Sequence, residues 1–137
     1  MSIALQLNII SIGIKGYNMT VNNAKEIVHL AMMEFEGVSS NIHRFGGTEY
    51  KLGKREIGHI HGNYIVDIPF PLKLRTEIIR NGEAEPHHIL PESGWVSVFL
   101  HNESDVNRAI ALLRRSYELA LIQMKRRSQQ HQNYSVL

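Results

Sequence analysis

The chain of 137 residues has no cysteine, only four prolines and one tryptophan, and no long apolar run. The missing cysteines exclude disulfides, thiolate nucleophiles and cysteine-ligated zinc. A membrane helix needs an apolar run of about 18 residues, so a membrane span is excluded. The lack of disulfides suits a reducing compartment, and we expect a cytoplasmic protein. With 43% hydrophobic and 20% charged residues, the composition is that of one folded domain rather than a disordered chain.

Positive charge is concentrated near the C-terminus. Residues 103–137 hold six bases and three acids, whereas residues 1–102 hold nine bases and ten acids. The run Lys125-Arg126-Arg127 could contact phosphates, but cations at this place also suit the end of a helix. Nucleic-acid binding through these three residues is therefore kept only as a third hypothesis.

The hydrophobic spacing predicts an α+β fold in a single compact domain. Asn23 to Glu26 has the spacing of a helix-capping box, Gly37 suits the end of that helix, and Asn102 or Ser104 suits the start of the last one. We expect an antiparallel sheet packed by the N- and C-terminal helices. The expected elements are a helix over 24–36, three strands within 38–70, a helix over 71–81, a loop over 83–94, a strand over 95–100 and a helix that ends near 127.

The domain is expected to span residues 19–127, followed by a frayed polar tail over 128–137. Residues 1–18 are apolar, but their first base, Lys15, follows the apolar stretch, which argues against a secretory signal. We expect this segment to be an edge strand, an arm exchanged in a homodimer, or an extension upstream of a start at Met19.

Two of the eight histidines, His59 and His61, alternate along a strand and so share one face, about 6–7 Å apart. Two imidazoles in this arrangement could hold one metal ion. The alternative is a structural pair at the rim of the core. Gly62-Asn63 matches a two-residue hairpin loop, which would place His59 opposite Val66 on a largely apolar face.

Two acidic residues lie close to this histidine pair in the sequence. With a two-residue loop, Asp67 would lie opposite Gly58 on the other face of the hairpin. Glu56 also has the wrong parity to face His59 and His61, unless Gly58 hosts a β-bulge. Glu56 is therefore a weaker ligand candidate than the histidines.

His87 and His88 lie in a loop between two prolines. Adjacent residues in extended backbone point apart, so only one of them is expected to join His59 and His61. Three imidazoles with an open position would form a catalytic type of site for zinc or a non-haem metal. The alternative is that the two histidines only order the loop.

Ser93 could act as a nucleophile with His88 and Asp67, but it lacks the Gly-x-Ser-x-Gly pattern, and turn chemistry accounts for Ser93-Gly94. Trp95 begins a strand of high β propensity. We expect Trp95 and the last helix to anchor the core; the alternative is that Trp95 is a ligand platform that supports the candidate site, together with Asp67 and Ser93.

Four stretches carry a family resemblance: Glu-Ile-Gly-His-Ile-His (56–61), Val-Asp-Ile-Pro-Phe-Pro (66–71), the segment 81–97 with Pro-His-His and Ser-Gly-Trp-Val-Ser, and Leu-Leu-Arg-Arg-Ser-Tyr (112–117). They resemble the luciferase-like domain family of bacterial and fungal proteins, mostly of unknown function, from about Val38 to Leu121. Phe45-Gly46-Gly47, Gly94-Trp95-Val96 and Ser116-Tyr117 are more weakly similar to MmcQ/YjbR-like domains. That similarity implies an antiparallel sheet packed by the first and last helices. Neither resemblance assigns catalytic residues.

The sequence thus leaves three hypotheses for function. The first is a non-catalytic binding module in which the histidine-rich strand and loop form a polar groove. The second is a metal-binding protein, with hydrolysis as a further option, that holds a divalent metal through His59, His61 and His87 or His88. The third is the nucleic-acid-binding domain described above.

Overall fold

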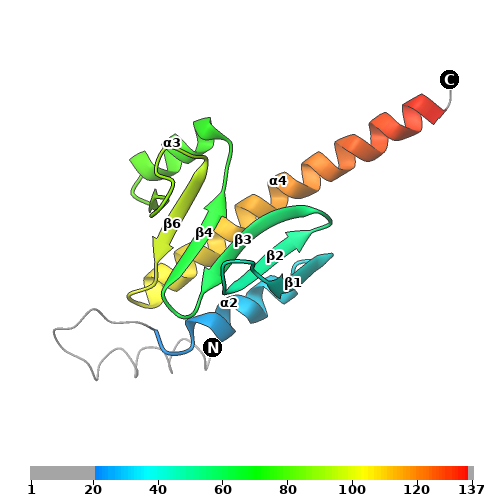
Figure 1. The fold of residues 1–137 in the computed structure, drawn as a ribbon. Coiled ribbons are helices and arrows are strands. Elements are labelled where there is room, and N and C mark those ends of the chain that lie inside the picture. The colour runs from blue at the N-terminus through cyan, green and yellow to red at the C-terminus, as the bar shows by residue number, and fades with distance from the viewer. Residues whose placement is uncertain (1–20, 136–137) are drawn as a thin grey trace.

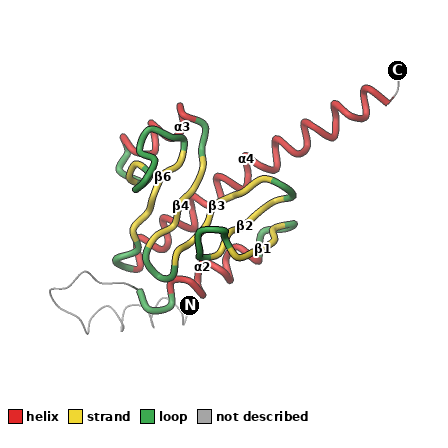
Figure 2. Tube along the Cα trace, in the orientation of Figure 1, coloured by secondary structure: helices red, strands yellow, loops and turns green. Residues whose placement is uncertain are grey.

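The computed structural model describes residues 21–135, and this part of the chain forms three helices and a six-stranded antiparallel sheet (Figure 1, Figure 2). The sheet has the strand order β1-β2-β3-β4-β6-β5. The elements are α2 (Ala24–Met33), β1 (Val38–Ile42), β2 (Thr48–Leu52), β3 (Arg55–His61), β4 (Ile65–Pro69), α3 (Leu72–Arg80), β5 (Glu85–Pro86), β6 (Trp95–Phe99) and α4 (Glu103–Ser135).

The α+β fold is confirmed, as is the antiparallel sheet with the last helix packed on it. The predicted element order is wrong in one respect, because four strands rather than three precede α3. The segment 83–94, predicted as a loop, also contains the two-residue strand β5. The predicted arm over residues 1–18 and the start at Met19 lie outside the described residues.

The two faces of the sheet have different surroundings. Alternate residues of the central strands, such as Val66 in β4 and Val96 and Val98 in β6, face α2 and α4 and are buried. The hydroxyl of Ser116 in α4 donates a hydrogen bond of 2.8 Å to the carbonyl of Ile57, which fixes the helix to β3. The opposite face carries polar side chains on the same strands, and the candidate site lies there.

The helix ends differ in part from those the sequence predicts. Asn23 makes no capping hydrogen bond, so the predicted capping box is wrong; instead the side-chain oxygen of Asn63 accepts a hydrogen bond from the Lys25 amide at 2.9 Å. Helix α2 ends at Met33, before the predicted 36. At the start of α4, the side chain of Asn102 accepts from the Asp105 amide, and the Asp105 carboxylate accepts from the Asn102 amide.

Helix α4 continues to Ser135, through most of the segment predicted as a frayed tail. Residues 122–135 contain no glycine or proline and are rich in Gln, Lys and Arg, which favour helix. This part extends beyond the sheet and is exposed (Figure 1). None of the helices in the described part of the chain is long and apolar enough to cross a membrane.

Candidate metal centre

The register of the β3–β4 hairpin decides which side chains meet. His59 pairs with Asp67 and His61 pairs with Ile65, so the loop has three residues rather than the predicted two. The predicted pairings of His59 with Val66 and of Asp67 with Gly58 are therefore wrong by one residue. Because side chains alternate along a strand, this shift brings Asp67 onto the histidine face.

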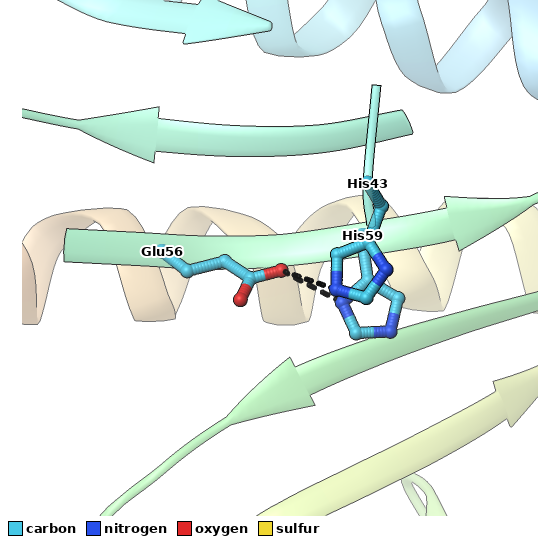
Figure 3. A group of neighbouring side chains, drawn as sticks. All are labelled: His43, Glu56 and His59. Carbon is cyan, nitrogen blue, oxygen red and sulfur yellow. Dashed lines mark hydrogen bonds and ion pairs between the residues drawn. The ribbon is translucent and has the colours of Figure 1, made fainter. Parts of the chain in front are cut away.

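A β-bulge in β3 brings Glu56 to the same face. Tyr50 of β2 pairs with Gly58 and Lys51 pairs with Glu56, which leaves Ile57 as the extra residue. A bulge near Gly58 was the condition under which Glu56 could face His59 and His61, and that bulge is present. Glu56 and His59, three residues apart, both project over the open face of the sheet, as Figure 3 shows.

Asp67 is the centre of the cluster, and its side chain is fully buried. Its Oδ1 atom accepts a hydrogen bond of 2.6 Å from the hydroxyl of Ser97. Four histidine Nε2 atoms surround its Oδ2 atom, at 3.0 Å (His88), 3.1 Å (His59), 3.5 Å (His87) and 3.8 Å (His61).

Both loop histidines therefore reach the cluster, and the prediction that only one would do so is wrong. The reason is that the chain is not extended at this point. The amides of Ile89 and Leu90 donate to His87 Nδ1 at 3.2 and 3.0 Å, which turns the backbone back on itself after His87. His87 and His88 can then both point to Asp67.

His59 lies between two carboxylates. Its Nδ1 donates a hydrogen bond of 2.7 Å to Glu56 (Figure 3). Its Nε2 lies 3.1 Å from Asp67 Oδ2. Burial alone would lower the pKa of His59, but the hydrogen bonds and negative charges of Asp67 and Glu56 outweigh it and raise the pKa to about 9. Burial would likewise raise the pKa of Asp67, yet hydrogen bonds from His59, Ser97 and His88 lower it to about 2.

The four histidines are not equivalent as metal ligands. Since His87 Nδ1 accepts two amide hydrogens, it carries no proton, and the proton of the neutral ring must lie on Nε2. Burial also lowers the pKa of His87 and keeps the ring neutral. Its Nε2–H therefore points to Asp67 and cannot ligate a metal, although distance alone groups His87 with Asp67 and His88.

The remaining candidate donors are the Nε2 atoms of His59, His61 and His88 and the Oδ2 atom of Asp67. Because the pKa of His59 is raised to about 9, a metal must displace the Nε2 proton of this ring on binding. A metal at about 2.0–2.2 Å from each ligand places neighbouring ligand atoms about 3.0–3.5 Å apart. The Nε2 atoms of His88, His59 and His61 lie 3.0, 3.1 and 3.8 Å from Asp67 Oδ2. The ligand atoms of His59, His61 and Asp67 all lie within 4.8 Å of one another, whereas His88 groups with Asp67 and His87, so His88 must move toward the other two histidines to complete a four-ligand site. Burial and the charge of His59 lower the pKa of His61, which favours the neutral form that a metal requires.

Two residues of the site were missed by the sequence analysis. The ring of His43, in the loop after β1, lies 4.2 Å from the ring of His59, and its Nε2 is 3.9 Å from Glu56 (Figure 3). Ser97 orients Asp67 and also accepts a hydrogen bond from the His88 amide. A signal for Ser97 was present, since it alternates with Val96 and Val98 and so must face away from the core.

Two other predictions concern the end of the loop before β6. Trp95 is only partly buried and lies 5.2 Å from the His59 ring, beside the cluster, so its prediction as a core anchor is wrong. Its position has the parity of Ser97, which directs the indole to the open face. The hydroxyl of Ser93 donates to the Leu90 carbonyl and accepts from the Trp95 amide, as the turn interpretation requires.

Lys125, Arg126 and Arg127 lie on the exposed extension of α4 and do not line the cleft beside the histidines. Nucleic-acid binding through them stays a prediction.

Between about pH 4 and 6.5 the metal-free protein is expected to keep the full stabilising contributions of both His59 and Asp67. The raised pKa of His59 adds stability below 6.5 that is lost as the pH rises through about 9, up to roughly 3 kcal/mol. The lowered pKa of Asp67 adds stability above 3.8 that is lost as the pH falls through about 2. Urea unfolding with a chelator from pH 6 to 9 measures the alkaline decline. His59→Gln should flatten it and the control His101→Gln should not; an equal decline in both variants would contradict the assignment.

Fold and site together define an α+β domain with a buried aspartate ringed by histidines. Residues 54–116 match the family model described as Luciferase domain, which confirms the resemblance to the luciferase-like family over this segment. The segment includes Glu56, Ser97 and all four candidate ligand residues, whereas His43 lies outside it. No curated protein and no solved structure matches the chain, and the similarity to MmcQ/YjbR-like domains stays a prediction.

Proposed function

We propose that this protein binds one divalent transition metal through the Nε2 atoms of His59, His61 and His88 and the Oδ2 atom of Asp67. The observation that carries the proposal is the convergence of these imidazoles on one buried carboxylate oxygen. Three imidazoles and a carboxylate suit zinc, iron, manganese or nickel.

The surrounding residues support the same conclusion. Metal-bound histidines usually donate their second ring N–H to a carboxylate or carbonyl, as His59 does to Glu56. Ser97 holds one oxygen of Asp67 and leaves the other for a metal. His87 is neutral with its proton on Nε2, and this N–H points to Asp67 Oδ2 and helps to orient the carboxylate.

The centre is accessible from one side. The side chains of His61 and His88 are 30% and 31% exposed and line a cleft, whereas His59 and Asp67 are buried beneath them. A metal held here could be reached by a small molecule or by water. Hydrolysis by a metal-bound water is one reaction that such a centre supports.

The polar binding groove without a metal is the second candidate. One observation favours it: both ring nitrogens of His59 already have carboxylate partners within the protein. In that case the cluster would be a fixed set of charges at the base of a ligand cleft.

Elemental analysis distinguishes the two candidates. Protein purified near pH 7.5 without a histidine tag or added metal is expected to contain about one equivalent of zinc, iron, manganese or nickel. The double variant His59→Ala/His61→Ala should lose it, because two of four ligands are removed. The matched variant His101→Ala/His131→Ala changes two exposed histidines outside the cleft and should keep it. No metal in the native protein, and no thermal stabilisation by added zinc, would favour the metal-free groove.

A further inference from the structure

A cleft of about 1180 Å³ lies over the candidate metal centre and has mainly apolar walls. Four of its apolar side chains are exposed to an unusual degree: Ile42 (89%), Phe45 (72%), Ile89 (70%) and Leu90 (56%). They come from two separate segments, one at the end of β1 and the other next to His87 and His88. Exposed apolar side chains gathered around one concave site are typical of a surface that binds an apolar ligand.

The aromatic residues of the cleft lie against the metal-binding histidines. Trp95 is 5.2 Å from the His59 ring, and Phe45 is 5.6 Å from the His43 ring, which itself lies on His59. An apolar group bound between Phe45 and Trp95 would therefore lie beside the centre rather than at a remote place on the surface.

The charges of the cleft favour an anion. Its carboxylates already have partners. Glu49 pairs with Lys51 at 3.2 Å, and Glu56 pairs with His59. Asp67 is surrounded by the four histidines described above. Arg44 and Lys54 also line the cleft and have no ion-pair partner among the described residues. A bound divalent cation would add further positive charge.

We infer that the cleft binds an organic anion with an apolar, aromatic body, such as an aromatic carboxylate. The body packs against Phe45, Trp95 and the exposed aliphatic side chains, and the anionic group lies between the metal and the basic side chains Arg44 and Lys54. This inference rests on the proposed function, because the metal supplies part of the attraction for the anion.

Calorimetric titration of zinc-loaded protein with 4-phenylbutyrate tests the inference, with butyrate and 4-phenylbutanol as matched probes that lack the ring or the charge. Zinc content is measured on the same sample. Saturable binding of 4-phenylbutyrate is expected, at least tenfold tighter than of either matched probe. Trp95 is the only tryptophan of the chain, so a change in its emission locates the ligand in the cleft.

Phe45→Ala and Lys54→Gln should each weaken 4-phenylbutyrate binding about fivefold or more and leave zinc binding unchanged. Tyr134→Ala and Lys73→Gln change an exposed aromatic and an exposed lysine outside the cleft and should have no effect. Normal zinc content without 4-phenylbutyrate binding would overturn the inference and leave the metal centre in place. Equal binding of 4-phenylbutanol would overturn the anionic part. Failure to bind zinc would overturn the proposed function and this inference with it.

Discussion

Asp67→Asn is expected to weaken zinc binding by at least about 100-fold. Asparagine keeps the shape of the side chain but removes the charge and one acceptor oxygen from the middle of the histidine cluster. The loss of a ligand exceeds the 10–100-fold effect that is usual for an outer-shell partner. The variant should also lose about 3–5 kcal/mol of stability without metal, because His59 is left as a buried cation paired only with Glu56. Competition with a chromophoric chelator gives the affinity, and urea unfolding gives the stability.

Asp105→Asn is the matched control for this prediction. Asp105 is also buried and hydrogen-bonded, but it caps α4 and pairs with Arg108, away from the cleft. This variant should lose stability and keep its zinc affinity within about twofold. Native zinc affinity in Asp67→Asn would show that the carboxylate is not a ligand.

Gly58→Ala is expected to destabilise the protein by about 2–3 kcal/mol and to weaken zinc binding as well. A Cβ atom at Gly58 would lie 2.6 Å from Leu113 Cδ2 and 2.9 Å from the backbone carbonyl of Asp67. Leu113 could move in part, but the carbonyl belongs to the neighbouring strand. The clash must therefore push β3 away from β4 or alter the bulge, and either change separates Glu56 and His59 from Asp67. Thermal or urea unfolding and the chelator titration measure the two effects.

Gly82→Ala provides the comparison. Unlike Gly58, Gly82 has a backbone conformation that favours glycine, with φ of +74°, but no heavy atom lies within 4 Å of a Cβ atom placed there. We expect a loss of about 1 kcal/mol from backbone strain alone and unchanged zinc affinity. If Gly58→Ala were as stable as Gly82→Ala, the predicted clash of a Cβ atom at Gly58 with Leu113 and the Asp67 carbonyl would be contradicted.

Most residues of the candidate site could be named from the sequence, but their arrangement could not. His59 and His61 follow from strand alternation alone. Asp67 faces these histidines only if the hairpin loop has three residues rather than two. The sequence does not decide between the two lengths, because Tyr64, Ile65 and Val66 are all apolar and either register buries apolar side chains. The structure exposes Tyr64 to 64% and buries Ile65, which selects the three-residue loop.

The fold was easier to predict than the contacts of particular side chains. Apolar spacing identifies α4 and its buried face, because a helix repeats the same pattern over many turns. Trp95 and His43 are single residues whose surroundings depend on distant strands and loops. Hydrophobicity placed Trp95 in the core, although its parity with Ser97 indicated the open face, and no local pattern marked His43.

The hydrogen bonds of Asn63 join two parts of the fold that are distant in sequence. Its side chain, at the tip of the hairpin that carries His59, His61 and Asp67, bonds to the backbone of Asn22 and Lys25 at the start of α2. The first turn of α2 therefore cannot open without loosening the tip of the hairpin. The hairpin and the helix should therefore protect their amides from solvent exchange as one cooperative unit. Ligand binding at the histidine cluster should then also raise the exchange protection of α2, on the opposite side of the sheet.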